Sequence, residues 1–141
     1  FRMIGYDCAH SRAGVNYERW DAIIFGQTDT IPIEIKSPGE EEFISVKAVR
    51  QALENKIILL SRNSFPTILE TTSLVVGYNL PNDRSEVMAL ISNIRKAYGI
   101  VIGVIDVHSL LRLVTATLFE GKSHNKNDIF NLYGIIDVSD I

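Results

Sequence analysis

Three charged side chains lie inside two stretches of sequence that otherwise have the composition of β-strands. Residues 20–26 and 31–37 are rich in β-branched and aromatic side chains, yet they contain Asp21, Glu34 and Lys36, and these residue types are depleted from strands. Two carboxylates brought close together can bind one Mg²⁺. Such an ion neutralises phosphate charge and acidifies a water, and a neighbouring lysine can orient or deprotonate that water or offset transition-state charge. The set therefore suits phosphodiester hydrolysis.

The spacing of these residues predicts that they share one face of an antiparallel hairpin. A polar link, residues 27–30, joins the two stretches. If the two central residues of the link form the tip, Asp21 faces Lys36 and Ile23 faces Glu34. Opposed side chains share a face and successive ones alternate, so the three charges converge, with Asp21 and Glu34 about 7 to 8 Å apart. We expect an apolar opposite face, formed by Trp20, Ala22, Ile24, Ile33 and Ile35.

The rest of the chain alternates between helical and strand patterns. Continuous or amphipathic apolar patterns predict each element, and glycine, proline or polar residues separate them. The expected order after the hairpin is a helix over 44–61, a strand over 72–80, a helix over 85–98, a buried strand over 100–107 and a helix over 110–119. This order predicts an α/β domain with one mixed β-sheet flanked by helices.

The charged hairpin and the elements after it resemble the PD-(D/E)XK nuclease superfamily, and within it the cleavage domains of type II restriction endonucleases. Asp21 is followed, after twelve residues, by Glu34-Ile35-Lys36 on a hairpin that precedes a helix. The resemblance implies a restriction-endonuclease-like mixed β-sheet. It also implies Asp21 and Glu34 as metal ligands, the backbone carbonyl of Ile35 as a third ligand, and Lys36 as the catalytic lysine.

Gln51, on the helix after the hairpin, resembles the polar residue that many members of this superfamily direct into the active site. It is therefore a fourth catalytic candidate. Alternatively, Lys47, Gln51 and Glu54 form one polar stripe, and such stripes are usually solvated helix faces. The chain departs from the family pattern at Trp20, where the family has a proline before the aspartate.

Simpler interpretations of the other charged residues also stay open. Asp21, Glu34 and Lys36 could form an ion-pair ladder on a solvated hairpin face, worth about 0 to 1 kcal/mol. Asp7 and Glu18 could supply an acid to a second metal or be ordinary surface acids. Similarly, Lys47 and Arg50 could contact phosphates or be ordinary surface cations.

Composition excludes several other classes of protein. The 141 residues are 46% hydrophobic and 22% charged, with net charge -3, which is typical of one globular domain and not of a basic nucleic-acid coat. The apolar runs are shorter than the roughly 20 residues of a membrane span. The single Cys8 cannot form an internal disulfide, which favours the reducing cytoplasm. The sequence shows no zinc-ligand spacing, acyl-transfer triad or nucleoside-triphosphate loop.

We therefore expect residues 1–141 to be a single nuclease domain of a larger protein. The expected activity is a Mg²⁺-dependent endodeoxyribonuclease, with Mn²⁺ able to substitute, that acts as the cleavage domain of a restriction enzyme. The alternatives are a repair or junction-resolving nuclease of the same fold and a non-catalytic α/β interaction module. Because the chain is acidic, we expect a separate domain or subunit to recognise the DNA. A homodimer would allow both strands to be cut.

Overall fold

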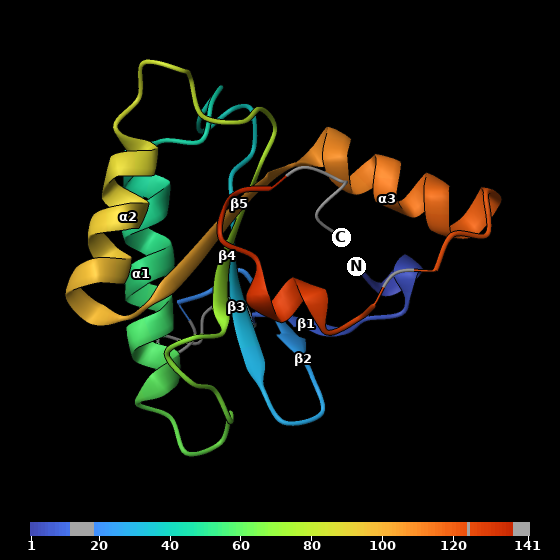
Figure 1. Cartoon of the computed structure of the whole chain (residues 1–141), viewed down its shortest axis with the longest axis horizontal. Coiled ribbons are helices and arrows are strands. Elements are labelled where there is room, and N and C mark those ends of the chain that lie inside the picture. The colour runs from blue at the N-terminus through green and yellow to red at the C-terminus, as the bar shows by residue number, and fades with distance from the viewer. Residues whose placement is uncertain (12–18, 124, 137–141) are drawn as a thin grey trace.

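Six strands form one mixed β-sheet in the computed structural model, which describes residues 1–11, 19–123 and 125–136 (Figure 1). The strands are β1 (Asp7–His10), β2 (Ala22–Phe25), β3 (Thr30–Ile35), β4 (Thr72–Gly77), β5 (Val101–Asp106) and β6 (Gly134–Ile135). They lie in chain order across the sheet. The pairs β1–β2 and β2–β3 are antiparallel, and the later pairs are parallel. The predicted α/β class with one mixed sheet is confirmed.

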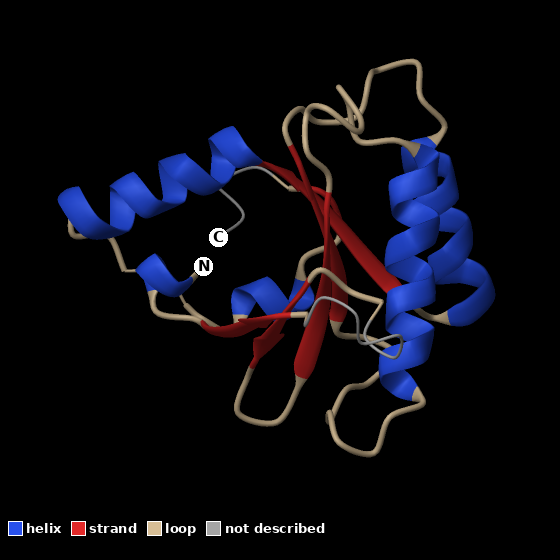
Figure 2. Ribbon diagram, turned by 180° about the vertical axis from the view of Figure 1, so that it is seen from behind, coloured by secondary structure: helices blue, strands red, loops and turns tan. Residues whose placement is uncertain are grey.

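Helices cover both faces of this sheet. α1 (Val46–Leu60) and α2 (Val87–Tyr98) lie side by side on one face, and α3 (Val107–Phe119) lies on the other with the short helices η1 (Arg2–Ile4) and η2 (Asp128–Asn131) (Figures 1 and 2). α1 and α2 are the crossovers that make β3, β4 and β5 parallel. No helix in the described ranges is both long enough and apolar enough to span a bilayer.

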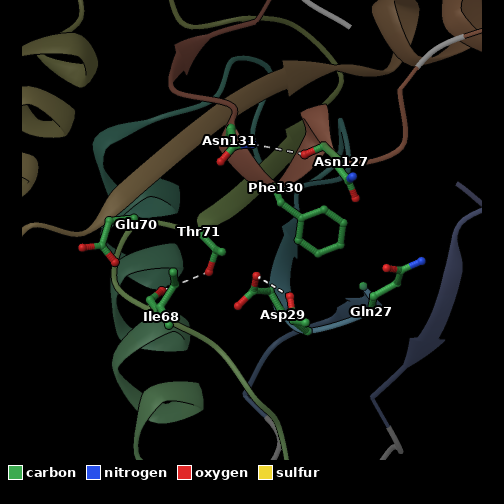
Figure 3. Close-up of a pocket in the computed structure, with 10 residues that line it drawn as sticks. Gln27, Asp29, Ile68, Glu70, Thr71, Asn127, Phe130 and Asn131 are labelled. Atoms are coloured by element: carbon green, nitrogen blue, oxygen red, sulfur yellow. Dashed lines mark hydrogen bonds between the residues drawn. The ribbon is translucent and has the colours of Figure 1, made fainter.

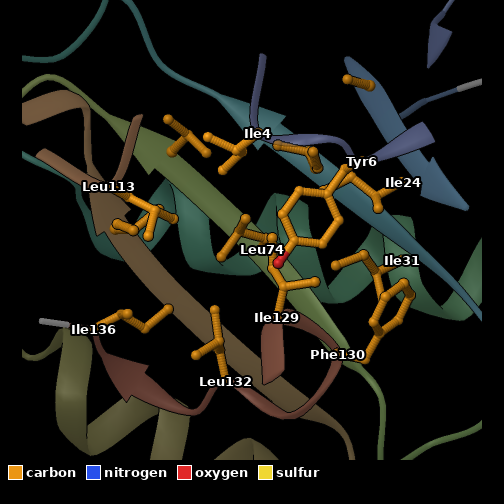
Figure 4. Close-up of a cluster of buried hydrophobic side chains, with 14 residues drawn as sticks. Ile4, Tyr6, Ile24, Ile31, Leu74, Leu113, Ile129, Phe130, Leu132 and Ile136 are labelled. Carbon is orange, nitrogen blue, oxygen red and sulfur yellow. The ribbon is translucent and has the colours of Figure 1, made fainter. Parts of the chain in front are cut away.

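Two hydrophobic clusters hold these layers together. The cluster under α3 and η2 contains Ile24, Ile31 and Leu74 from the sheet (Figure 4). The cluster on the other face joins the inner sides of α1 and α2 to alternate residues of β4 and β5. Since successive residues of a strand point to opposite faces, β4 and β5 contribute to both clusters. This accounts for the almost continuous apolar sequence of β5.

Local sequence signals explain where the predicted helices begin and end. Ser45 caps α1, because its hydroxyl accepts hydrogen bonds from the backbone N–H groups of Lys47 and Ala48. Gly99 ends α2 in the left-handed conformation, with φ 70°. α3 begins earlier than predicted, because the Asp106 side chain caps it by accepting from the Ser109 N–H.

The hairpin of β2 and β3 has a longer tip than we predicted. Ala22 lies opposite Ile33 and Phe25 opposite Thr30, which leaves a four-residue tip over 26–29. The predicted register is therefore wrong by two positions. Within the tip, the Gly26 N–H donates to the Asp29 carbonyl oxygen at 2.7 Å. The Phe130 ring packs so closely on Gly26 that a β-carbon would not fit there.

A shift of two positions leaves the strand side chains on their predicted faces, because side chains alternate with period two. Before β2 the chain bends at Asp21, whose backbone N–H donates to the Ile33 carbonyl oxygen at 3.0 Å, so Asp21 does not face Lys36 as we predicted. The charged residues still approach one another.

Trp20 is on the opposite face from the one predicted. Its side chain is buried with Ile23 and Leu59 on the α1 side of the sheet, and its ring lies edge-on to Phe65 with centroids 5.7 Å apart. The chain bends at Trp20 and Asp21 before β2 begins. Strand alternation therefore does not extend to Trp20.

A buried lysine ties α1 to the loop that leads into β4. Lys56 is fully buried, and its ammonium group donates to the hydroxyls of Thr67 and Thr71 at 2.8 and 2.6 Å. Burial lowers the pKa of Lys56 to about 8, although the negative charges of Asp29 and Glu70 act in the opposite direction. The folded chain therefore binds the proton of the Lys56 ammonium group more weakly than the unfolded chain does.

We predict that Lys56 makes the folded chain relatively more stable as the pH rises. Between the folded pKa of about 8 and the ordinary value of 10.5, the unfolded chain binds more protons. Stability relative to Lys56→Met should therefore rise by about 2 kcal/mol from about pH 7 to about pH 10. Urea unfolding of both proteins at both pH values measures this difference. Lys47→Met, an exposed change in the same helix, should show no such trend, and parallel pH curves for Lys56→Met would contradict the account.

Candidate active site

An open cleft of about 510 Å³ lies where β3 ends and the chain enters β2. The residues that line it are His10, Arg19, Asp21, Glu34, Ile35, Lys36, Ser37, Glu40 and Gln51. All five residues predicted for the site are among them. The fold thus brings Gln51 of α1 to the charged end of the hairpin, the position that the family resemblance implied.

A buried ion pair forms the base of this cleft. The Lys36 Nζ lies 2.8 Å from Glu34 Oε1, and the two residues are only 8% and 4% exposed. A ladder of surface ion pairs on a solvated face would leave both side chains exposed, so that interpretation is wrong for Glu34 and Lys36, although Asp21 is exposed. α1 covers this face of the hairpin. Burying two charges costs free energy that attraction alone does not always repay, and such groups concentrate at functional sites.

Asn55 holds the second oxygen of Glu34. Its side-chain Nδ2 donates to Glu34 Oε2 at 2.8 Å, and both groups are buried. We did not predict this residue. It lies four positions after Gln51 and therefore on the same face of α1, which is the signal that could have identified it. Asn55 fixes the carboxylate plane of Glu34 and so the direction of Oε1.

Asp21 bonds to the edge of β3 beyond the last pair of β2. Its Oδ2 accepts a hydrogen bond from the Ile35 N–H at 2.7 Å. On the other edge of β3, the Lys36 N–H donates to the Val76 carbonyl at 2.8 Å. Because C=O and N–H of one trans peptide point in opposite directions, the Ile35 carbonyl must point away from β4. It therefore faces the edge where the Asp21 carboxylate lies.

Gln51 lines the same cleft and has an unsatisfied side-chain oxygen. Its Oε1 is buried, and no residue in the described part of the chain donates a hydrogen bond to it. Buried polar atoms normally have partners, so this oxygen has the capacity to accept a bond from a water or to bind a cation. The neighbouring Lys47 and Glu54 are exposed. The solvated-stripe interpretation therefore describes these two residues but not Gln51.

The environment shifts the pKa of both members of the ion pair upward. Burial raises the pKa of Glu34, and hydrogen bonds from Lys36 and Asn55 only partly offset it, while the charge of Asp21 adds to it. For Lys36, burial acts to lower the pKa, but the contact with Glu34 and the charges of Glu40 and Glu41 outweigh it, so the pKa is raised. The site is therefore richer in negative charge than its one buried cation balances.

These donors fit a hard divalent cation better than a zinc ion. Asp21, Glu34, the Ile35 carbonyl and the Gln51 side chain offer only oxygen ligands, which Mg²⁺ prefers. Across the described residues there is no group of three or more His, Cys, Asp and Glu side chains that could hold a metal ion. A cation here would thus use two carboxylates and complete its shell with neutral oxygens and water.

Three other charged residues that we considered, Asp7, Lys47 and Arg50, do not line the cleft. Asp7 pairs with Phe25, which lies three residues along β2 from Ala22. Asp7 is therefore roughly 10 Å along the strand from the end of β2 at which the cleft lies. Lys47 and Arg50 are exposed on α1 and do not line the cleft. Glu18 lies outside the described residues. The idea of a second metal at Asp7 therefore finds no support in the fold.

A second cavity, of about 260 Å³, lies at the opposite end of the hairpin (Figure 3). Asp29 and Gln27 of the hairpin tip, Thr71 before β4 and Asn131 of η2 line it. None of the residues predicted for catalysis reaches it.

Comparisons of the chain with protein-family models, with curated proteins and with solved structures find no match.

We predict that Asn55→Ala will destabilise the fold by about 1 to 3 kcal/mol, because it leaves a buried carboxylate oxygen unpaired. Urea unfolding measures the loss. Asn79→Ala is the matched control, since the Asn79 side chain donates to the Glu42 carbonyl in an exposed hydrogen bond and should cost much less. Equal small losses for the two variants would mean that Asn55 does not hold Glu34.

Proposed function

We propose that this chain is a Mg²⁺-dependent endodeoxyribonuclease that hydrolyses DNA phosphodiesters, with Mn²⁺ able to replace Mg²⁺. One observation carries the proposal. The Glu34–Lys36 pair is buried at the base of an open cleft, and the Asp21 carboxylate and the Ile35 carbonyl face the same place. A fold gains little stability from such a pair, whereas metal-assisted phosphodiester hydrolysis needs these groups together.

Each residue of the cleft has a distinct part in this proposal. Asp21 and Glu34 would hold the cation, with the Ile35 carbonyl as the third protein ligand. The bound cation would supply charge neutralisation at the phosphate and acidify a water. Lys36 would orient the attacking water and offset the charge that develops on the phosphate oxygens. Gln51, through its unpaired Oε1, would accept a hydrogen bond from that water.

A restriction-endonuclease-like fold and a separate DNA-recognition partner would both accompany this function. The antiparallel β1–β3 unit followed by the α1, β4, α2 and β5 elements is the order that supports a restriction-endonuclease-like fold. With net charge -3, the chain would rely on another domain or subunit to recognise DNA. One site cuts one strand, so double-strand cleavage would need a second copy, as in a restriction enzyme.

One observation favours the non-catalytic alternative. Both oxygens of Glu34 already have protein partners, Lys36 and Asn55, so the network is closed without a metal. A carboxylate oxygen can accept more than one contact, so these partners do not by themselves prevent Glu34 from binding a cation. A metal-binding measurement separates the two functions, because an interaction module needs no divalent ion.

We predict that Glu34→Gln will abolish Mg²⁺-dependent cleavage of DNA, with a loss of at least about 1,000-fold, under conditions where the variant is still folded despite its unpaired buried lysine. Asp21→Asn and Lys36→Ala should have the same effect. Plasmid nicking gives the activity, and circular dichroism checks the fold. Asp7→Asn is the matched control and should cleave like the unsubstituted chain.

Titration calorimetry with Mn²⁺ or Ca²⁺ completes this test. Binding that disappears in Asp21→Asn and Glu34→Gln supports the nuclease. Divalent-ion binding that is absent, or that is unchanged in both variants, would favour the interaction module. For an active chain, comparison of linear duplex, single-stranded and four-way-junction DNA distinguishes a restriction-type enzyme from a repair or junction-resolving nuclease.

We predict opposite effects on stability and activity for Gln51→Leu. Replacing an unsatisfied buried amide by an apolar side chain of similar size removes a desolvation cost, so the free energy of unfolding should stay equal or increase. Cleavage should fall by about tenfold or more, because the water loses an acceptor. Urea unfolding and plasmid nicking on one preparation measure both quantities. A large loss of stability would assign Gln51 a structural role instead.

A further inference from the structure

The side chains that line the cleft carry more negative than positive charge. Its lining contains three carboxylates, those of Asp21, Glu34 and Glu40, against two permanent cations, Lys36 and Arg19. Lys36 is already bound to Glu34 at the base. A DNA strand that enters this cleft therefore needs a second cation, placed where a phosphate passes.

Arg19 is the cationic side chain at the rim that can meet this need. It lies two residues before Asp21, lines the cleft and is 62% exposed. Its Nη1 lies 3.0 Å from the Glu54 Oε1, the one ion-pair contact recorded for the guanidinium in the described residues. The group carries further N–H donors in a planar fork. Such a fork matches two oxygens of a phosphate.

The pairing with Glu54 sets the position of Arg19 at low cost. Glu54 is on α1, three residues after Gln51 and one before Asn55, so the contact holds the guanidinium on the α1 side of the cleft. Both side chains are more than half exposed, and exposed pairs of this kind contribute only about 0 to 1 kcal/mol. A phosphate can therefore replace Glu54 as the partner of Arg19 with little loss.

We propose that Arg19 is the phosphate-binding residue at the rim of this cleft, and that it exchanges Glu54 for a phosphodiester oxygen when a DNA strand binds. The inference rests on the proposed nuclease function, because it names how that site receives its substrate. Glu54 is then a positioning residue that keeps the guanidinium in place and competes with the phosphate.

The test compares Arg19→Ala with Glu54→Gln, because the two changes act in opposite directions on phosphate binding. Fluorescence anisotropy of a short labelled DNA duplex, titrated with the protein in Ca²⁺, gives the affinity at several salt concentrations. Arg19→Ala should weaken binding about tenfold and reduce the salt slope by about one. Glu54→Gln should bind as tightly as the unsubstituted chain or about two- to fivefold more tightly, since the guanidinium loses its competitor.

Lys122→Ala is the matched control for the loss of one positive charge. Lys122 pairs with Glu120 in a similarly exposed ion pair and does not line the cleft. Lys122→Ala should change the DNA affinity less than twofold, because Lys122 acts on the DNA only through a screened long-range charge. Circular dichroism and urea unfolding of all variants check that the fold is intact.

The outcomes separate this inference from the proposed function. Equal weakening in Arg19→Ala and Lys122→Ala, weakening in both Arg19→Ala and Glu54→Gln, or no DNA binding by the unsubstituted chain would each overturn the role of Arg19. Cleavage that persists with unchanged affinity in Arg19→Ala overturns the inference alone. Arg19-dependent binding by a chain that never cleaves DNA in Mg²⁺ supports the phosphate site and overturns the nuclease.

Discussion

The buried ion pair between Glu34 and Lys36 is the constraint on which the rest of the candidate site depends. α1 packs over the end of β3, so water reaches these charges very little and protein groups must satisfy most of their bonding capacity. Asn55 takes the remaining oxygen of Glu34. The raised pKa of Glu34 shows that this compensation is incomplete. A divalent cation between Glu34 and Asp21 would supply the missing positive charge, which is why burial and the proposed function belong together.

The position of this pair could be predicted from the sequence although the hairpin register was not. Side chains alternate between the two faces of a strand with a period of two residues. A register shift of two positions therefore leaves the charged residues of a hairpin on the same face, whereas a shift of one would not. The four-residue tip at 26–29 therefore shifted the β2–β3 register by two positions, and Glu34 kept its predicted face of the sheet. The helices and the strands β4 and β5 were predictable for a similar reason, since their apolar periodicity and their caps are local signals.

The features that the sequence did not predict depend on contacts between distant segments. β1 and β6 are short strands whose only signal is their pairing partner. Trp20 is on the α1 side because the chain bends before β2. Asn55 looks like an ordinary polar helix residue until α1 is packed on β3, and Arg19 gains a role only when the cleft beside it is known.

A crystal of this chain soaked in Mn²⁺ tests most directly whether a cation binds at the charged end of the hairpin. Anomalous difference density should lie between the carboxylates of Asp21 and Glu34, within coordination distance of the Ile35 carbonyl oxygen. The Lys36 ammonium group should remain beside the bound cation and Glu34. Density that is absent at this position, with Glu34 still bound only to Lys36 and Asn55, would contradict the account.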